Sequence, residues 1–285
     1  MNNQNPDSMK FSLILATLGR TTELERFLYH LKNQNYSRYE LIIVDQNRKD
    51  VLRPIIEPYH SSIQIKYFKA APGLSRARNV GLEHVSGEIV TFPDDDCWYT
   101  PIFLEQMAKR FDSQPSTDGF TGQTVDEDYK SIIRFAKKPG YLTKINAWQR
   151  VNSSSMFFRK YVISGVGTFD EDLGPGSGTL WGCADDVDYI IRCVDMGYRV
   201  YYDPNIIAFL LDHRRYGYSS LHGSAHKYGA GIGRVWKKHK FPYWYVSYHL
   251  FRPLAGALAS IISANLQKSK YHWLSFLGRW QGWRS

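Results

Sequence analysis

The chain has 285 residues, of which 43% are apolar and 22% are charged. This composition is ordinary for a globular protein, and the length allows one large α/β domain or a domain with an appendage. No apolar run reaches the roughly 18 to 20 residues that a membrane-spanning helix needs, so we expect none.

The net charge of +9 is concentrated in the last quarter of the chain. Of the 36 Lys and Arg residues, 12 lie from Arg214 onward, where there is no Asp or Glu. The part before it therefore holds 24 basic and 27 acidic residues. This asymmetry indicates an anionic surface as a partner for the tail.

Cysteine usage and the first residues of the chain both bear on the cellular compartment. The three cysteines form no Cys-x-x-Cys pair and favour a reduced, intracellular compartment. Residues 1–8 are polar and do not resemble a signal peptide, so we expect residues 1–9 to be disordered.

Strand and helix patterns alternate through the first part of the chain. Strands are predicted at residues 10–17, 39–45, 63–68 and 88–92. One helix is predicted to begin at residues 21–23 and another to cover residues 76–84. This order is typical of a parallel doubly wound sheet, in which ligands bind beyond the carboxyl ends of the strands. Thr17, Asp45 and the run Asp94-Asp95-Asp96 all fall at such ends.

The three adjacent aspartates have two interpretations. They form either an acidic turn that caps the next helix or a cation site, since Asp94 and Asp96 offer the oxygen ligands that suit Mg²⁺ or Mn²⁺. Their place at a strand end favours the metal site. Side chains alternate along a strand, so Asp95 is expected to point the other way and to be the most replaceable.

The middle of the chain is less regular. Residues 112–130 read as polar and turn-rich, and residues 151–159 as a strand followed by a short helix. The glycine-rich residues 169–178 lack the preceding strand and the Gly-Lys-Ser/Thr of a phosphate-binding loop, so a mobile loop over a pocket is predicted. The glycines at 229–233 are rejected as a phosphate-binding loop for the same reason.

A predicted helix at residues 181–196 begins with an acidic run. Asp185 and Asp186 lie at its amino end, where they either cap the helix or act as a general base. Residues 199–203 and 206–211 are predicted as two further strands, followed by Asp212 and His213.

Taken together, residues 10–213 resemble the family 2 glycosyltransferases of the GT-A fold. The resemblance rests on five segments in order: residues 12–17 (SLILAT), 42–45 (IIVD), 73–81 (GLSRARNVG), 92–96 (FPDDD) and 185–188 (DDVD). It implies a Rossmann-like, mostly parallel central sheet flanked by helices. It also implies a metal-dependent, inverting transfer of sugar from a nucleotide-sugar donor.

The resemblance also implies roles for individual residues. Asp45 would bind the nucleotide base, and Asp94 would lie near the ribose. Asp96, with Asp94, would bind the Mn²⁺ or Mg²⁺ that bridges the diphosphate, and His213 stands where some members have a further metal ligand. Asp186 would deprotonate the acceptor hydroxyl. The nucleotide pocket would be completed by Thr17, Arg76, Arg78 and Asn79.

Two departures from the family pattern affect these roles. Gln46 and Asn47 follow Asp45, whereas many relatives have Asp-Gly-Ser after the base-binding acid. The acidic motif begins with Asp185, where relatives more often have Glu. Asp185 is therefore the alternative base. A zinc site built from Cys97, Cys183 and His213 is disfavoured, because oxygen ligands dominate here and the cysteine spacing fits no zinc motif.

The tail, residues 214–285, interleaves its 12 basic residues with 15 aromatic ones. We predict a helical extension that associates with an anionic membrane interface. The alternatives are a helical cap on the catalytic domain and a nucleic-acid surface, and the enzymatic core argues against nucleic acid and for a lipid-linked acceptor.

The sequence thus predicts a glycosyltransferase of cell-surface polysaccharide or glycolipid synthesis, peripheral on the inner face of the cytoplasmic membrane. Its acceptor would be a glycan or a lipid-linked sugar. The competing functions are a nucleotidyltransferase with a similar metal-diphosphate site and a non-catalytic nucleotide-sugar-binding module.

Overall fold

The computed structural model of the chain describes residues 9–131, 133–211 and 218–285, without the side chains of residues 218–221. The predicted disordered residues 1–8 therefore lie outside the described part. The described residues divide into two compact units. The first contains the residues up to 72 with Arg76–Phe169 and Tyr189–Leu211, and the second contains Gly73–Ser75, Asp170–Asp188 and residues 218–285.

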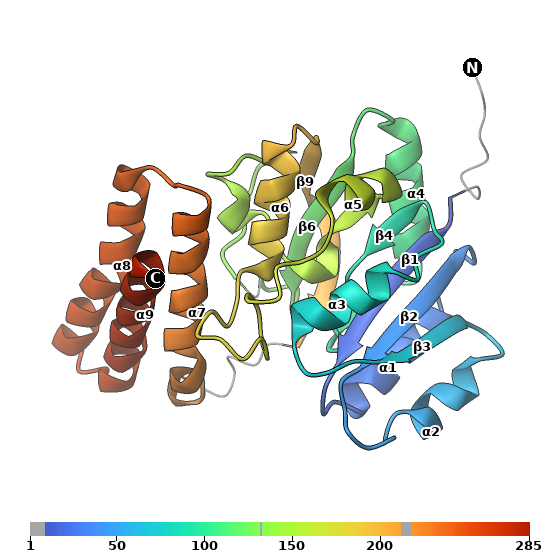
Figure 1. Ribbon diagram of the computed structural model, residues 1–285, viewed down its shortest axis with the longest axis horizontal. Coiled ribbons are helices and arrows are strands. Elements are labelled where there is room, and N and C mark those ends of the chain that lie inside the picture. The colour runs from blue at the N-terminus through green and yellow to red at the C-terminus, as the bar shows by residue number, and fades with distance from the viewer. Residues whose placement is uncertain (1–8, 132, 212–217) are drawn as a thin grey trace. The chain divides into compact units, whose positions relative to one another are not determined.

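The first unit is built on one mixed sheet, whose strands among the described residues lie in the order β3-β2-β1-β4-β8-β6-β9-β5, with β7 beside β9 (Figure 1). Strands β1 to β4 are parallel, as predicted, and β8 joins them antiparallel to β4. The strands are β1 Phe11–Thr17, β2 Tyr39–Asp45, β3 Gln64–Lys69, β4 Ile89–Thr91, β5 Cys97–Trp98, β6 Gly119–Val125, β7 Gly140–Tyr141, β8 Phe157–Arg159 and β9 Val200–Leu210.

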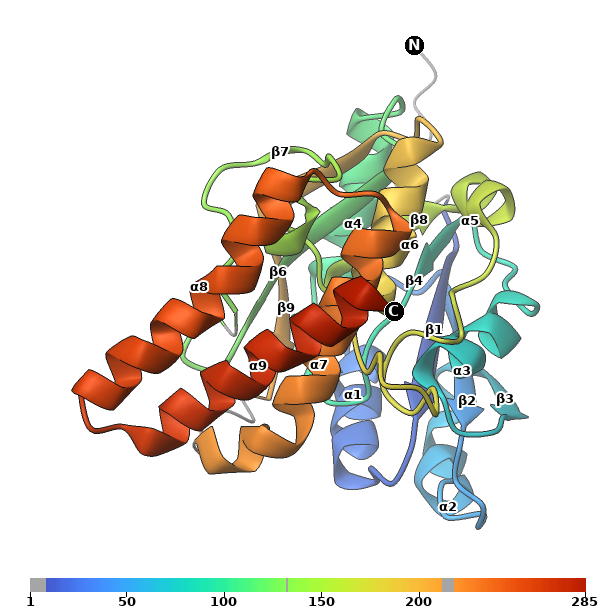
Figure 2. The ribbon, with the colours of Figure 1, turned by 60° about the vertical axis from the view of Figure 1, so that its left-hand side comes forward.

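Helices cover the sheet of the first unit and form most of the second unit (Figures 1 and 2). Helix α1 buries one apolar face, made of Leu24, Phe27, Leu28 and Leu31. The helices are α1 Thr22–Lys32, α2 Arg53–Ile56, α3 Leu74–Leu82, α4 Phe103–Ser113, α5 Lys160–Val166, α6 Asp185–Asp195, α7 Tyr218–Lys238, α8 Tyr243–Ile262 and α9 Leu266–Arg284.

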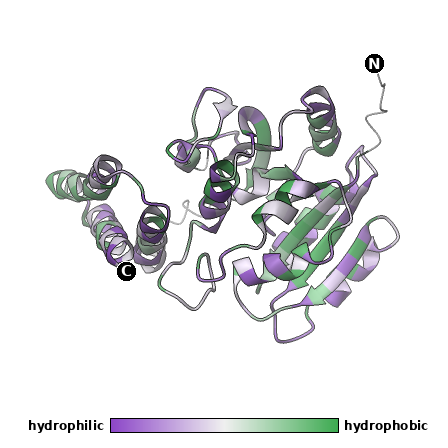
Figure 3. Cartoon of the chain, turned by 45° about the horizontal axis from the view of Figure 1, so that its top comes forward, coloured by the Kyte–Doolittle hydropathy of each residue, from purple (hydrophilic) through white to green (hydrophobic). Residues whose placement is uncertain are grey.

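Strand β1 is buried on both faces, and the central strands are largely green in the hydropathy view (Figure 3). Phe11, Leu13 and Leu15 share one core cluster with the apolar residues of α1 and α4. On the alternate face, Ile14 meets α3 at Gly81, where a Cβ would lie 2.4 Å from Ile14 Cγ2. The glycine therefore allows the helix to approach the strand closely, which accounts for the last position of the 73–81 motif.

Strand β6 corrects the reading of residues 112–130 as turns. Its sequence, GFTGQTV, contains glycines and threonines but is almost wholly buried. A Cβ at Gly122 would lie 2.1 Å from the carbonyl oxygen of Ile206 on β9, so this glycine permits close contact between the two strands.

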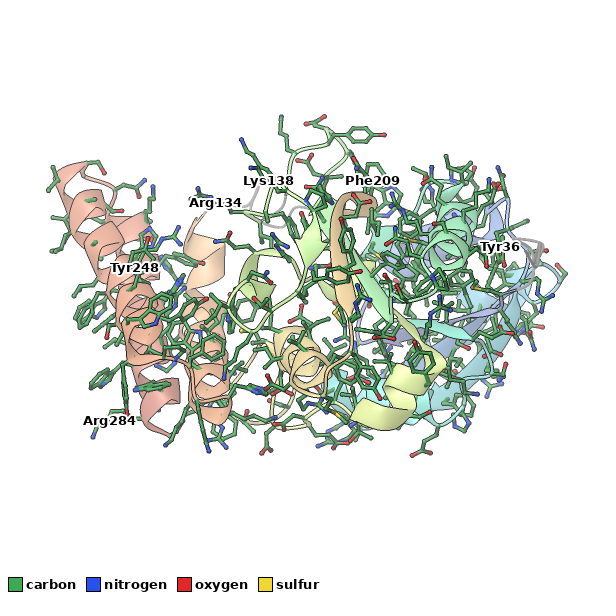
Figure 4. All side chains as sticks on the ribbon, turned by 90° about the horizontal axis from the view of Figure 1, so that it is seen from above. Tyr36, Arg134, Lys138, Phe209, Tyr248 and Arg284 are labelled. Atoms are coloured by element: carbon green, nitrogen blue, oxygen red, sulfur yellow. The ribbon has the colours of Figure 1, made fainter. Side chains whose placement is uncertain are left out.

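Two other boundaries differ from the prediction. The two strands predicted at 199–203 and 206–211 are one strand, β9, whose pairing with β6 shifts register partway along it. Phe209 on β9 (labelled in Figure 4) stacks on Trp98 of β5, with 5.5 Å between ring centroids. The strand predicted at 151–159 is a 3-10 turn at Ser153–Ser155 followed by β8.

In the second unit, α9 packs against both α7 and α8. The glycines at 229–233 lie inside α7, where Gly229 and Gly233 face the backbone of α9. From the other side, a Cβ at Gly282 would lie 1.9 Å from the carbonyl oxygen of Ala230. These glycines therefore serve close helix packing. Among the described helices, none is long and apolar enough to cross a membrane.

Helix α8 contains a proline in its interior, Pro253. A helical proline leaves the carbonyl four residues earlier without its usual N–H donor. Here that carbonyl, of His249, accepts a hydrogen bond of 2.5 Å from Nη1 of Arg279 on α9. Burial lowers the pKa of Arg279 to about 10, so this guanidinium is still charged at neutral pH.

Candidate active site

Three of the predicted positions meet at one edge of the sheet in the first unit. The parallel register of β1 and β2 places Thr17 opposite Asp45. Beyond the end of β4 the chain continues beside β1, where Asp94 pairs with Ala16. The carboxyl ends of these strands therefore bring Thr17, Asp45 and Asp94 to one edge, as the sequence predicted.

Asp45 is completely buried, and its carboxylate is fully engaged. Oδ1 accepts hydrogen bonds from the backbone and side-chain N–H groups of Asn47, while Oδ2 accepts from Tyr67 and, at 2.6 Å, from Lys69 Nζ. Burial acts to raise the pKa of Asp45, but these donors outweigh it and lower the pKa. Asp45 is thus an ionised anchor for the loop that follows β2.

Asp94 is held from two sides. Its Oδ1 lies 3.1 Å from Nη2 of Arg78, whose side chain is 1% exposed. Its Oδ2 accepts hydrogen bonds from the hydroxyls of Ser153 and Ser154, at 2.9 and 2.8 Å. The two serines were not among the predicted site residues. Asn152 caps their 3-10 turn by accepting from Ser154 N–H, and an Asn-Ser-Ser-Ser run is the only local signal for it.

Asp95 and Asp96 converge on a single guanidinium. Nη1 of Arg20 lies 2.7 Å from Asp95 Oδ1 and 2.7 Å from Asp96 Oδ2. Both aspartates are 5% exposed. Burial raises the pKa of Asp95 to about 6, against the opposite effect of Arg20.

The expectation that Asp95 points away from Asp96 is therefore wrong. The chain turns at Asp95 and Asp96 instead of continuing as a strand, so the alternation of side chains ends before them. The sequence also gave no signal for Arg20, which belongs to a loop and meets the aspartates only through the fold.

Two other predicted residues bind backbone. Asn79 is 9% exposed, and its amide exchanges two hydrogen bonds with the backbone of Phe169, at 3.0 and 2.7 Å. Arg76 donates to the carbonyl of Pro72 at 2.8 Å. Asn79 therefore fixes the start of the glycine-rich segment within the fold.

The chemistry of this edge fits a hard divalent cation. Among the described residues, no three His, Cys, Asp or Glu side chains form a metal-ligating group, and His213 lies outside them. Mg²⁺, however, needs only one or two carboxylates when phosphates complete its coordination. Two carboxylate oxygens already converge on the Arg20 nitrogen. They belong to Asp95 and Asp96, whereas the oxygens of Asp94 face Arg78 and two serines.

The cysteines do not share this character. Cys97 is completely buried, and burial raises the pKa of its thiol well above the ordinary value, so it is a neutral core residue. Cys183 is only partly buried, and its thiol donates to the carbonyl of Tyr228 at 3.1 Å.

The acidic motif begins helix α6 in the second unit. Asp185 is 5% exposed, and its carboxylate packs against Gly174, where a Cβ would lie 2.9 Å from Oδ1. Asp186 is more accessible and accepts a hydrogen bond from the backbone N–H of Val187 at 2.7 Å. Both carboxylates also lie in the first turn of the helix, where its dipole stabilises negative charge.

Asp188 is completely buried and is held by the end of α7. Its Oδ1 lies 2.8 Å from Nζ of Lys238 and accepts a hydrogen bond of 2.7 Å from Nε2 of His239. Lys238 Nζ also lies 2.6 Å from Asp170 Oδ2, at the start of the glycine-rich segment. We call Lys238, His239, Asp170 and Asp188 the α7 latch. It ties the tail to the acidic motif within the second unit.

The glycine-rich segment packs on the first residues of α3. Pro175 accepts a hydrogen bond of 2.9 Å from Leu74 N–H, and Leu173 accepts one of 2.8 Å from the Ser75 hydroxyl. Together with α7 the segment lines a cavity of about 450 Å³. Its wall includes the glycines 174, 176 and 178, the hydroxyl groups of Ser177 and Thr179, Lys227 and Tyr228.

Comparison with known proteins finds a matching family model and similar sequences. A family model described as "Glycosyl transferase family 2" matches residues 12–164. Glycosyltransferase AglE of Haloferax volcanii is 26% identical over 238 residues, which are 79% of this chain and 73% of that protein. The GalNAc(5)-diNAcBac-PP-undecaprenol beta-1,3-glucosyltransferase of Campylobacter jejuni is 34% identical over 91 residues, 30% of this chain and 29% of that one.

Among solved structures, the mannosyltransferase PcManGT from Pyrobaculum calidifontis, in complex with GDP-Man and Mn²⁺, has the same fold. The TM-score is 0.64 at 19% identity, and the match covers 94% of this chain and 74% of that chain.

Proposed function

Because the chain belongs to glycosyltransferase family 2, we propose that it transfers a sugar from a nucleotide-diphosphate sugar to a glycan or a lipid-linked acceptor. The reaction would serve the synthesis of a cell-surface polysaccharide or glycolipid at the inner face of the cytoplasmic membrane. The observation that carries the proposal is the gathering of Thr17, Asp45 and Asp94 beside Arg78 at the carboxyl edge of the sheet.

In this proposal the donor lies at that edge. Asp45 would accept a hydrogen bond from the base, although four donors already occupy its two oxygens. A carboxylate has about four lone-pair sites, so the base must replace one donor. Lys69 is the donor best placed to leave, because its side chain is 43% exposed. Asp94 would face the ribose, oriented by Arg78 and the two serines.

A divalent cation, Mn²⁺ or Mg²⁺, would be held by Asp96, with Asp95 in place of Asp94 as the second carboxylate. When bound, it would neutralise charge on the departing diphosphate. Arg20 now compensates both carboxylates, and its side chain is 39% exposed, so it can turn toward the solvent or toward a phosphate. The complex of PcManGT with GDP-Man and Mn²⁺ supports a cation in this role.

The acceptor would be activated by Asp186. Its carboxylate takes the proton of the acceptor hydroxyl, the hydroxyl oxygen attacks the anomeric carbon, and the nucleoside diphosphate leaves with the electrons of the broken C–O bond. Attack opposite the leaving group inverts the anomeric carbon. Asp186 is more accessible than Asp185, which supports it as the base, while Asp185 packs against Gly174.

The cavity beside the glycine-rich segment is the proposed place of the acceptor. Its hydroxyl groups and backbone N–H groups suit a sugar, the ring of Tyr228 suits stacking, and Lys227 suits a phosphate. A lipid-linked acceptor is supported by the name of the Campylobacter jejuni relative and by the basic, aromatic tail.

The test is a transfer and hydrolysis assay over a panel of nucleotide sugars, with Mn²⁺, with Mg²⁺ and with a chelator. We expect release of nucleoside diphosphate from one donor, lost with the chelator and in Asp96→Ala. Full activity with the chelator or in Asp96→Ala would contradict the proposed role of the cation. Donor binding with no turnover on any acceptor would favour a binding module, and pyrophosphate release from a nucleoside triphosphate would favour a nucleotidyltransferase.

A second experiment tests the base. Asp186→Asn keeps the shape of the side chain and removes its basicity, so it should bind the donor normally and lose at least about a hundredfold in turnover. Asp185→Asn is the matched comparison. Normal transfer by Asp186→Asn together with loss of transfer in Asp185→Asn would identify Asp185 as the base.

A further inference from the structure

Helix α8 presents a continuous apolar stripe to the solvent. Trp244, Tyr248, Phe251, Leu258 and Ile262 are 66%, 64%, 54%, 58% and 88% exposed. Their spacings of four, three, seven and four residues place them on one face of a helix. From Trp244 to Ile262 the stripe is about 27 Å long at 1.5 Å per residue. The label for Tyr248 marks it in Figure 4.

This stripe is not the face that packs in the second unit. The opposite side of α8 buries Tyr245, Val246, Leu250 and Ala257. Arg252 is the only charged residue of the helix. A helix that is apolar on both faces is normally buried on both, so the outer face of α8 is suited to contact something apolar outside the protein.

The chemistry along the stripe changes from one end to the other. Aromatic residues occupy its first half, and Leu258, Ile261, Ile262 and Leu266 surround the turn between α8 and α9. Trp and Tyr favour the headgroup level of a membrane, whereas aliphatic side chains favour the acyl region. The order of residues therefore matches a helix that enters a bilayer obliquely, with the α8–α9 turn deepest.

The charge around the stripe favours a lipid surface over a protein partner. Residues 218–285 contain 10 Lys and Arg residues and no Asp or Glu. Arg252 and Lys270 are exposed on α8 and α9. Anionic lipids attract every such cation within a Debye length, and long basic side chains reach back to the headgroups.

We propose that the outer face of α8 is the membrane-contacting surface of this protein, with Ile261, Ile262 and Leu266 in the acyl region of an anionic leaflet. The inference rests on the proposed function only in placing the acceptor in that leaflet. Beyond the proposed function, the inference specifies that α8 makes the contact and that the α8–α9 turn enters the leaflet deepest.

Flotation of the full chain with vesicles tests the inference. The vesicles contain phosphatidylcholine alone or with phosphatidylglycerol. We expect flotation with the anionic vesicles only, and Ile262→Ser should weaken partitioning about tenfold, because burying one Ile side chain is worth about that factor. Met196→Ser is the matched control, since Met196 is 55% exposed outside the second unit and should partition like the unaltered protein.

Three results would overturn the inference. They are no flotation of the unaltered protein, equal flotation of Ile262→Ser, and a dimer in light scattering that Ile262→Ser dissociates without any flotation. The last would make the stripe an interface between two copies. Flotation that depends on Ile262 in a protein without transfer activity would support the surface and contradict only the proposed function.

Discussion

The α7 latch makes a specific prediction about stability. Lys238→Met keeps the length of the side chain and removes its charge, which takes away both ion pairs, with Asp170 and with Asp188. Asp188 has no exposed side-chain surface, so its carboxylate would stay in the interior without its lysine partner while keeping the His239 hydrogen bond.

The magnitude follows from the burial of each partner. Removing one member of a fully buried ion pair costs about 3–5 kcal/mol. Here Lys238 and Asp170 are each 30% exposed, and water can replace part of the interaction. We therefore expect a loss of about 2–3 kcal/mol, which lowers the melting temperature by about 3–5 °C.

The measurement is thermal unfolding at neutral pH, with the neighbouring Lys237→Met as control. Lys237 Nζ donates only to the carbonyl of Arg284, at 3.0 Å, in an exposed position. This control loses the same charge but removes no ion pair from a buried carboxylate. Its free energy of unfolding should stay within about 0.5 kcal/mol of that of the unaltered protein. Equal melting temperatures for the two variants would refute the reasoning.

Three further predictions concern other buried contacts. Hydrogen bonds from Ser12, Ser86 and Lys66 outweigh burial and lower the pKa of Glu40 to about 2, from 4.5. Its stabilisation of about 3 kcal/mol is therefore complete above about pH 4.5 and lost as the pH falls toward 2, so Glu40→Gln should show a flatter acid-unfolding curve. Gly282→Ala forces α7 and α9 apart and should cost at least about 2 kcal/mol in urea unfolding. Arg78→Met leaves Asp94 without its cation and should weaken donor binding, measured by calorimetry, at least about tenfold.

Each of these has an outcome that contradicts it. Acid unfolding of Glu40→Gln that parallels the unaltered protein would show that Glu40 does not titrate below its ordinary pKa. Gln281→Ala, next to Gly282 but exposed, should be neutral, and equal costs would remove the packing argument. Arg76→Met is the control for Arg78→Met, because Arg76 donates to the carbonyl of Pro72 at 2.8 Å, and this variant should bind the donor more nearly as the unaltered protein does.

The parallel part of the fold could be predicted because its signals are local. Apolar runs such as residues 39–45, each followed by a turn and a helix, specify strands and connections without reference to distant residues. Strand β6 could not be recognised this way. Its glycines and threonines resemble turn residues, and the reason for Gly122 is the backbone of Ile206, far along the chain.

The candidate site divides along the same line. Asp45 and Asp94 could be predicted because each lies at or shortly beyond the carboxyl end of its strand. Arg20, Ser153 and Lys238 carry no such mark, since what makes them important is the carboxylate that the fold brings to them. The assignment of the aspartates needed the structure too, because a turn decides which two carboxylates converge.

The glycines of α7 have a consequence for how the second unit holds together. This helix contains four glycines in 21 residues, and each is about 1 kcal/mol less favourable than alanine in a helix interior. Alone, α7 would form poorly. At Gly229 and Gly233 the backbone of α9 fills the space that the missing side chains leave, so the helicity of α7 depends in part on α9. The backbone amides of both helices should therefore exchange with heavy water through one shared opening event. The ion pair of Lys238 and the hydrogen bond of His239 with Asp188 of the acidic motif would break in that same event.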